Sequence, residues 1–386
     1  MTTEKKLLFI TPTLPESGDS GGLIVTLERI ELLARRFDVT VLAITASEAA
    51  IRKCRERFGL KAVHHAGALR PRTITGLARS WIEGLPLAIW RNVDPAFLDM
   101  AKSLSKQQFD ITYVDHWLMW PAMQELAHPG YRVLNLHNAE HLLFVRAAER
   151  ARFPMRQVLQ SEGRRSAAYL RDICRSADEL HFISHTDMDE VMRLGGIETR
   201  SRAFLPWVPV DDGSYGRFGG NALFVGTMSW APNAEGARWY EDHVAPLLPS
   251  GLITDIAGGY INGVPPEAPH AQVHWHGRVP DLSPLYQEAG VFVAPLLSGS
   301  GIKMKILNAL GRGLPVVTTS LGAEGFPAGW EDAVVVADDP QGFADAVRRL
   351  TTDRDAWQRA AAAAKPYLQR HFSPEQFNQW TEQTAR

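Results

Sequence analysis

A glycine-rich turn followed by two lysines is the stretch of the sequence with the clearest chemical potential. The segment SGSGIKMKILNALGRG, 298–313, begins with small residues and continues with the lysines: Gly299, Ser300, Gly301, Lys303 and Lys305. The apolar spacing predicts a helix over 302–312, with both lysines in its first turn. Lysines there oppose the helix dipole at a cost of about 0.3–1 kcal/mol each. Backbone N–H groups, dipole and ammonium groups together predict a site for a phosphate.

The alternative is that these lysines are solvent-exposed and tolerated at a small energetic cost. Lys305, Asn308 and Arg312 are spaced at i, i+3 and i+7, so they share one stripe of the predicted helix. Such a stripe could run from a phosphate toward a ribose. The segment alone does not decide between the two interpretations.

Short apolar strands alternate with helices through both halves of the chain, which predicts an α/β fold with two doubly wound parallel sheets. Strands are expected at 6–14, 38–44, 110–115, 131–137 and 178–184, and again at 221–228, 251–259, 272–277, 291–296, 314–320 and 333–338. The Pro-, Gly- and Asp-rich stretch 204–220 is the expected linker. We therefore predict a first domain over 1–205, a second over 206–372, and a terminal helix over 373–386 that packs back on the first. Ligands of such sheets bind beyond the carboxyl ends of strands, in a cleft between the domains.

Composition is that of a globular protein: 386 residues with 45% hydrophobic and 22% charged residues. Cys54 and Cys174 lie far apart without a C-x-x-C pair, which argues against a disulfide framework and a zinc site. The apolar run near the N-terminus is too short for a signal peptide or a membrane span. We expect a cytoplasmic protein, with the inner face of the membrane as an additional location.

Charge is distributed unevenly along the chain. Residues 1–205 carry 28 Lys and Arg against 24 Asp and Glu (+4), and residues 206–386 carry 13 against 19 (−6). Eight arginines fall within 146–175. They indicate either a solvated helix face or a docking surface for an anionic acceptor or a lipid headgroup, hence peripheral membrane contact. Nucleic acid is not expected as a partner, because no recognition motif accompanies the arginines.

Several motifs together resemble the family 4 glycosyltransferases, which are GT-B enzymes that transfer a sugar from a nucleotide donor. The resemblance is carried by APLLSGSGIKMKILNALGRGLPVVTTSLGAEGF (294–326), LFVGTMSWAPNAEGARWY (223–240) and HGRVPDLSPLYQEAGVFVAP (276–295). In the first half SGG (20–22), VDHW (114–117), LNLHNAEH (134–141) and ISHTDMDEV (183–191) match in order and spacing. It implies two Rossmann-like domains facing a cleft and a role in building exopolysaccharides or other glycans.

The resemblance implies roles for particular residues of the first half. Gly21 and Gly22 align with a glycine loop beside the donor diphosphate. His116 aligns with a catalytic histidine that contacts the donor sugar. His137 and Asn138 match an "HN" pair on the acceptor side.

In the second half the resemblance implies a donor site. Lys303 and Lys305 align with basic residues that hold the diphosphate, next to the amide of Gly301. Arg278 aligns with the place where the base is read, and Glu324 borders the site.

Two positions depart from the family pattern. Ser300 and Asn308 stand where members commonly carry glutamates that contact the donor sugar and the ribose. An amide offers one acceptor oxygen where a carboxylate offers two. We therefore expect altered ribose recognition, which favours a dTDP donor over a UDP or GDP donor.

The expected activity is transfer of a sugar to a hydroxyl acceptor, with retention of configuration and with no metal or other cofactor. Two alternatives remain: a catalytically silent nucleotide-sugar binding subunit, and a nucleotide-sugar epimerase of similar fold. A nicotinamide-dependent oxidoreductase is disfavoured because no G-x-G-x-x-G follows the first strand.

Overall fold

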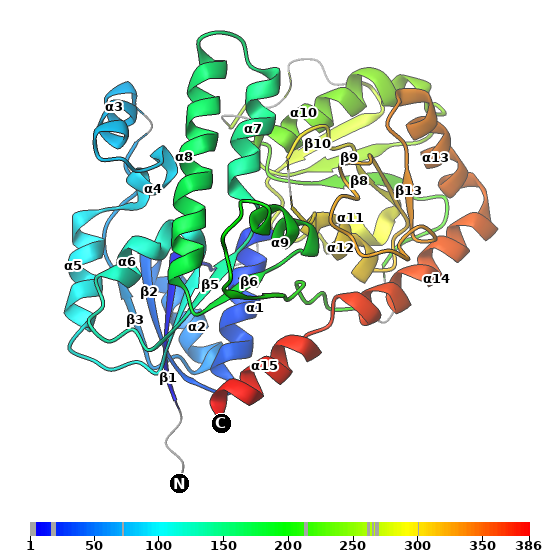
Figure 1. Cartoon of the computed structure of the whole chain (residues 1–386). Helices are drawn as coiled ribbons and strands as arrows, with labels where there is room; N and C mark the ends of the chain where they lie inside the picture. Colours follow the sequence, from blue (N-terminus) through cyan, green and yellow to red (C-terminus); the bar gives the residue numbers. More distant parts are fainter. Residues whose placement is uncertain are drawn as a thin grey trace. The chain divides into compact units, whose positions relative to one another are not determined.

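The computed structural model describes residues 5–16, 21–71, 73–211, 215–260, 263–264, 266, 270–299 and 301–386. These residues form two compact units. The first contains Gly22–Pro206, the described residues before position 17 and the terminal segment Pro374–Arg386. The second contains Trp207–Ser373 together with Gly21. Figure 1 shows both units, with labels on many of their helices and strands.

The first unit is built on a parallel sheet of seven strands in the order β3-β2-β1-β4-β5-β6-β7. Its strands are β1 (Lys6–Leu14), β2 (Asp38–Ala46), β3 (Ala62–His65), β4 (Ile111–Asp115), β5 (Tyr131–Leu136), β6 (Glu179–Phe182) and β7 (Arg200–Ala203). Its helices are α1 (Gly21–Ala34), α2 (Glu48–Phe58), α3 (Ile74–Ile82), α4 (Leu87–Asn92), α5 (Pro95–Leu104), the single turn η1 (Trp117–Met119), α6 (Trp120–Gln124), α7 (Glu140–Arg150), α8 (Met155–Ser176), α9 (His185–Met192) and α15 (Glu375–Ala385).

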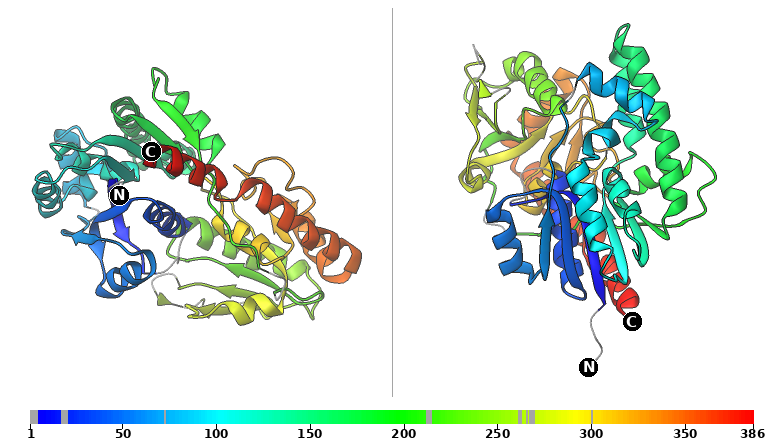
Figure 2. Two further views of the ribbon diagram at one scale, coloured as in Figure 1. Left: turned by 90° about the horizontal axis from the view of Figure 1, so that it is seen from below. Right: turned by 90° about the vertical axis from the view of Figure 1, so that its left-hand side faces the viewer.

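Successive residues of a strand face opposite sides of this sheet, and both sides are buried. Leu8 and Ile10 of β1 pack in a cluster with apolar residues of α5, α6 and α8. Leu7 and Phe9 pack on the other face with residues of α1, α2 and α15. The continuous apolar run of β1 is therefore explained by helices on both faces, as Figure 2 shows from two further directions.

The second unit repeats this plan with a parallel sheet of six strands in the order β10-β9-β8-β11-β12-β13. The strands are β8 (Asn221–Val225), β9 (Thr254–Ala257), β10 (Val273–Gly277), β11 (Ala289–Ala294), β12 (Val316–Thr318) and β13 (Val334–Val336). The helices are α10 (Ala231–Trp239), η2 (Tyr240–Val244), η3 (Ala245–Leu247), α11 (Ser283–Glu288), α12 (Met304–Gly311), α13 (Pro340–Thr352) and α14 (Arg354–His371).

Two strands were not predicted from the sequence. Both are edge strands, β3 with the sequence AVHH and β7 with the sequence RSRA, and neither is fully buried. A short edge strand has one neighbour and one covered face, so it lacks the apolar run that marks a central strand. The strand order reverses at β1/β4 in the first unit and at β8/β11 in the second, and such points are where open α/β sheets bind ligands.

The helix α15 lies within the first unit although it comes from the end of the chain. Trp380 is 3% exposed, its ring centroid is 4.5 Å from that of His181, and its Nε1 donates to Glu179 at 3.2 Å. Arg29 of α1 is fully buried, lies over the ring of Phe377 at 4.4 Å, and donates to the carbonyl of Phe204. Residues far apart in sequence thus share one polar and aromatic core.

We predict that Trp380→Ala lowers the free energy of unfolding of the first unit by about 3–5 kcal/mol, because it removes a large buried ring and a hydrogen bond. Urea unfolding followed by circular dichroism measures this loss. Gln383→Ala, at an exposed position of the same helix, is the matched control and should shift stability by less than about 0.5 kcal/mol. Equal unfolding midpoints for Trp380→Ala and the control would show that α15 does not stabilise this unit.

Candidate active site

A buried carboxylate organises the carboxyl ends of the strands in the first unit. Asp115, the last residue of β4, is fully buried and accepts three short hydrogen bonds. The donors are Thr26 Oγ1 at 2.6 Å, Asn135 Nδ2 at 2.8 Å and His137 Nε2 at 2.8 Å. These residues come from α1 and from the end of β5, so the carboxylate joins both elements to β4 at the point where the strand order reverses.

Asp115 is ionised at every physiological pH. Burial by itself would raise the pKa of Asp115, but the charge and hydrogen bond of His137 and the donors Thr26 and Asn135 lower it to about 2. An ionised carboxylate accepts, so the Nε2 of His137 carries a proton. The remaining ring nitrogen, Nδ1, faces Gly22: a Cβ at position 22 would lie 3.6 Å from it. Glycine at this position leaves Nδ1 uncovered.

A second histidine–carboxylate pair lies beside the first. The Nε2 of His116 is 3.2 Å from Oε1 of Glu140, which also accepts from Asn138 Nδ2 at 3.2 Å. Burial raises the pKa of Glu140, but the hydrogen bond and charge of His116 and the Asn138 bond lower it overall. The His116 and His137 ring centroids are 5.4 Å apart. Three of the residues expected from the sequence therefore come together with two carboxylates.

The backbone of His116 is strained. Its φ is 93°, the one positive value at a non-glycine position among the described residues. Such a conformation costs on the order of 1–3 kcal/mol and persists where the surrounding structure imposes it. Here β4 ends and the turn η1 begins, and the amide of Leu118 donates to Nδ1 of His116 at 3.5 Å. In this conformation the Nε2 of His116 lies within reach of Glu140.

Neither Asp115 nor Glu140 was identified from the sequence as a site residue. Each has a signal in hindsight: Asp115 ends a strand directly before His116, and Glu140 lies two residues after the "HN" pair. Gly21 and Gly22, which were identified, are the first two residues of α1.

In the second unit Lys305 lies at the corresponding reversal of strand order. Its Nζ donates to Asn233 Oδ1, and Asn233 in turn donates from Nδ2 to the carbonyl of Thr227 at 2.9 Å. The ammonium group also lies 5.0 Å from the ring centroid of Phe224 in β8. Asn233, in α10 after β8, thus connects this strand to the lysine of α12 that follows β11.

Desolvation, and secondarily the positive charge of Lys303, lowers the pKa of Lys305 to about 7. Burial of the ammonium group therefore destabilises the folded state below about pH 7. This penalty is relieved as the pH rises toward 10.5, which is the pKa of a free lysine side chain. An anion bound beside Nζ would raise the pKa again, so this site gains free energy from binding negative charge.

The predicted helix 302–312 begins later than expected. Gly301 has a φ of 72°, and α12 starts at Met304, so Lys303 is the residue before the helix and only Lys305 lies in its first turn. The reason is local: the Nζ of Lys303, which is 8% exposed, turns back to donate to the carbonyl of Gly301. Lys303 also lies 3.9 Å from Glu324 Oε2, so these three expected residues do come together.

The other expected donor-site residues lie in α12 and after β10. Asn308 is half-buried one turn along α12 from Lys305, and its carbonyl accepts from Arg312 Nη1 at 3.0 Å. Arg312 stacks on Tyr286 at 4.4 Å, which ties its side chain to α11. Arg278 is exposed and follows the edge strand β10. Ser300 lies outside the described residues.

Two features are absent from the described ranges. No group of three or more His, Cys, Asp or Glu side chains there could hold a metal ion. In the same ranges, no helix is both long enough and apolar enough to cross a bilayer.

Comparison with known proteins defines the class of this fold. Over 98% of the chain and 99% of the other protein, it is similar to Anabaena HepE, solved in complex with UDP-glucose, with a TM-score of 0.66 and 14% identity. It is also similar to sucrose-phosphate synthase from Thermosynechococcus elongatus, with a TM-score of 0.68 and 14% identity over 98% of both chains. The two Rossmann-like units therefore form the GT-B fold, as expected from the sequence.

Sequence comparison assigns a family resemblance to part of the second unit. Residues 219–353, which contain the lysine site, match the family described as Glycosyl transferases group 1. The resemblance stated from the sequence is therefore confirmed over this segment. The chain is also 27% identical over 218 residues to "Uncharacterized 44.6 kDa protein in cps region" of Klebsiella pneumoniae. That match covers 52% of the chain and 54% of the relative, about half of each.

We predict that the affinity for inorganic diphosphate falls as the pH rises from 7 to 9, because Lys305 must gain a proton to bind the anion. A free pKa of about 7 gives a loss on the order of ten- to fiftyfold. Isothermal titration calorimetry measures it. Lys305→Arg is the matched control, because an arginine stays charged and its pH profile follows the ligand alone. Parallel profiles for the two proteins would contradict the role of Lys305.

Proposed function

We propose that the protein is a glycosyltransferase that moves a sugar from a nucleotide-diphosphate donor to a hydroxyl acceptor. The observation that carries this proposal is the pair Lys303 and Lys305 beyond the carboxyl ends of β8 and β11. The pair lies inside the segment that matches the group 1 family. The UDP-glucose bound to HepE, a protein of the same fold, supports a nucleotide sugar as the donor.

In this proposal the second unit stabilises the leaving group. Negative charge develops on the departing diphosphate, and preorganised positive groups at that position supply the largest catalytic term. Lys305 is preorganised by Asn233 and Lys303 by the carbonyl of Gly301. The bound diphosphate replaces these oxygens as the partner of the ammonium groups. Because two lysines provide the charge, the proposed reaction needs no metal ion.

The first unit supplies the acceptor side. With Nε2 of His137 donating to Asp115, Nδ1 faces Gly22 and is the ring nitrogen left to contact an acceptor hydroxyl. An acceptor hydroxyl that donates to Nδ1 is oriented for attack, and Asn138 is the second acceptor contact. His116, held by Glu140, contacts the donor sugar.

We propose that the reaction retains the configuration of the sugar, with a departing phosphate oxygen taking the acceptor proton. NMR of the anomeric proton in the first-formed product decides this point. Inversion would instead assign the acceptor proton to His137.

Two observations support different nucleotide bases in the donor. Asn308, where relatives carry a glutamate, favours dTDP, whereas the UDP bound to HepE favours UDP. Thermal shifts with UDP, GDP and dTDP distinguish these donors. We propose a glycan or glycolipid acceptor and a place in polysaccharide biosynthesis, which the relative from the cps region supports.

We predict that Lys303→Ala and Lys305→Ala each lower turnover at saturating acceptor by ~10²-fold, because each removes charge from the leaving group. Transfer of a radiolabelled sugar from the donor found by thermal shift measures this. Lys365→Ala, an exposed lysine on α14 of the same unit, is the control and should leave turnover unchanged.

Three other outcomes of the transfer assay would overturn the proposal. Wild-type rates in both lysine variants would remove the role of the site. Donor binding without any product would favour a silent binding subunit. Conversion of the donor to an epimer without an acceptor would favour an epimerase.

We also propose a cytoplasmic location with peripheral membrane contact through the tip of the α7–α8 hairpin. Phe153 is 80% exposed and Met155 is 56% exposed, next to the exposed Arg152. Exposed apolar side chains beside a cation suit an anionic lipid surface.

We predict that vesicles containing phosphatidylglycerol co-sediment the protein and that Phe153→Ser/Met155→Ser reduces the bound fraction at least fivefold, by removing inserted apolar area. The control is the same double variant with neutral phosphatidylcholine vesicles, to which neither protein should bind. Equal sedimentation of wild type and variant would refute this contact.

A further inference from the structure

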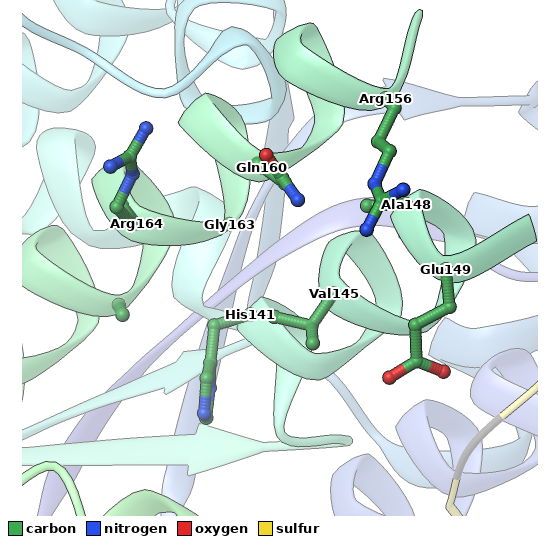
Figure 3. A pocket seen from close by; sticks show the side chains of 9 residues that line it. His141, Val145, Ala148, Glu149, Arg156, Gln160, Gly163 and Arg164 are labelled. Atoms are coloured by element: carbon green, nitrogen blue, oxygen red, sulfur yellow. The ribbon is translucent and has the colours of Figure 1, made fainter. Parts of the chain in front are cut away.

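A groove of about 450 Å³ lies between the two helices of the α7–α8 hairpin in the first unit. Figure 3 shows its walls, in which each helix contributes one stripe of side chains. The stripes have the same i, i+4, i+8 spacing, so their members point to one side of each helix: His141, Val145 and Glu149 on α7, and Arg156, Gln160 and Arg164 on α8.

A glycine sets how closely the two helices approach. Gly163 is buried, and a Cβ there would lie 3.4 Å from Val145 Cγ2 and 3.5 Å from Phe144 Cβ. The helices are therefore in contact at this level and part on one side, where the groove opens between longer side chains. The cavity is a feature of helix packing within one unit.

The arginines of the hairpin differ in what they contact. Arg165 is tied to the fold: it pairs with Glu162 and donates to the carbonyl of Ser80 at 2.6 Å. Its neighbour Arg164, and Arg156 two turns earlier, are exposed and make no ion pair or side-chain hydrogen bond with any residue that the structure describes. Two guanidinium groups on one wall are thus available to a ligand, against one carboxylate, Glu149, on the other.

A third polar group lies at the end of the groove near the sheet. His141 is 7% exposed, and its Nδ1 is buried without a hydrogen-bond partner among the described residues. Burial lowers the pKa of His141, against the opposing charges of Glu190 and Glu140, so the ring is neutral. A buried polar atom without a partner is costly, and a ligand hydroxyl that bonds to it would remove that cost.

The groove adjoins the histidine–carboxylate pair of His116 and Glu140 in the first unit. His141 follows Glu140, the residue that holds His116. From there α7 runs to Glu149, eight residues or about 12 Å along the helix. Gly163 lies against the carbonyl of His141, so its neighbour Arg164 is near this end of the groove, and Arg156 is near the Glu149 end. A ligand with one end at His116 and His137 would thus pass Arg164 and have its distant part beside Arg156.

We propose that the α7–α8 groove binds an acidic saccharide, and that Arg156 and Arg164 select an acceptor that carries a carboxylate or a phosphate beyond its reacting sugar. Two unpaired arginines match an anionic oxygen group in charge and bidentate geometry. Val145 and Ala148 offer apolar surface to the ring carbons, and His141 offers a partner for a hydroxyl. The inference rests on the proposed function in so far as the bound saccharide is the acceptor.

The test measures binding directly, so it does not require transfer activity. The probes are a tetrasaccharide of alternating glucuronate and N-acetylglucosamine and the same compound with its carboxylates reduced to alcohols, titrated by calorimetry into the full-length protein. We expect the acidic probe to bind at least tenfold more tightly than the reduced one. Arg156→Gln/Arg164→Gln should remove this difference.

The control Arg52→Gln/Arg55→Gln removes two exposed arginines from α2, which packs on the other face of the sheet, and should preserve the tenfold preference. Equal binding of the two probes to the wild type, or a preference that survives in the Arg156/Arg164 variant, would overturn the inference.

Vesicles containing phosphatidylglycerol form a second arm. Loss of vesicle binding in the Arg156/Arg164 variant, with no saccharide binding by the wild type, would assign the groove to a lipid headgroup and overturn the saccharide inference.

Thermal shift with UDP and dTDP forms a third arm. An unchanged nucleotide shift in the variant separates a failure of this inference from a failure of the donor site.

Discussion

The buried ammonium group of Lys305 is the constraint from which the chemistry of the second unit follows. A cation removed from water is unfavourable unless an opposite charge or good acceptors replace the lost solvent. The fold provides the amide oxygen of Asn233 and the ring of Phe224, which are weaker partners than a carboxylate. A site with an incompletely compensated positive charge has an intrinsic affinity for anions, and the second positive charge of Lys303 increases it. The adjoining glycines allow a ligand to approach the backbone closely.

The first unit has the same topology but buries a charge of the opposite sign. There the buried charge is negative, and Asp115 is compensated by three donors from α1 and the end of β5, which leaves its hydrogen-bonding capacity largely satisfied. Such a carboxylate orients neighbours instead of recruiting a ligand. The local sign of each site is also opposite to the net charge of its half of the sequence, +4 for 1–205 and −6 for 206–386. The net charge of each half therefore does not indicate the charge of its ligand. The positions of individual charged groups determine it.

The central strands and the long amphipathic helices could be predicted from the sequence, because their apolar patterns are set by burial on both faces of a sheet. The edge strands β3 and β7 could not, since their half-exposed sequences resemble loops. The start of α12 was also missed, because the bond from Lys303 to the carbonyl of Gly301 depends on side-chain packing and not on helix propensity. His116 and His137 were found through a family resemblance. Asp115 and Glu140 were not, because their importance comes from burial and from partners distant in sequence.

The placement of α15 has a consequence for co-translational folding. Residues 374–386 are synthesised after the whole of the second unit, yet Phe377 and Trp380 complete a core whose other buried members all precede residue 205. The first unit emerges early but keeps an uncovered apolar face until residues 374–386 leave the exit tunnel. Nascent chains stalled after the second unit would therefore expose this face to chaperones. Emergence of residues 374–386 is the event that lets the first unit close.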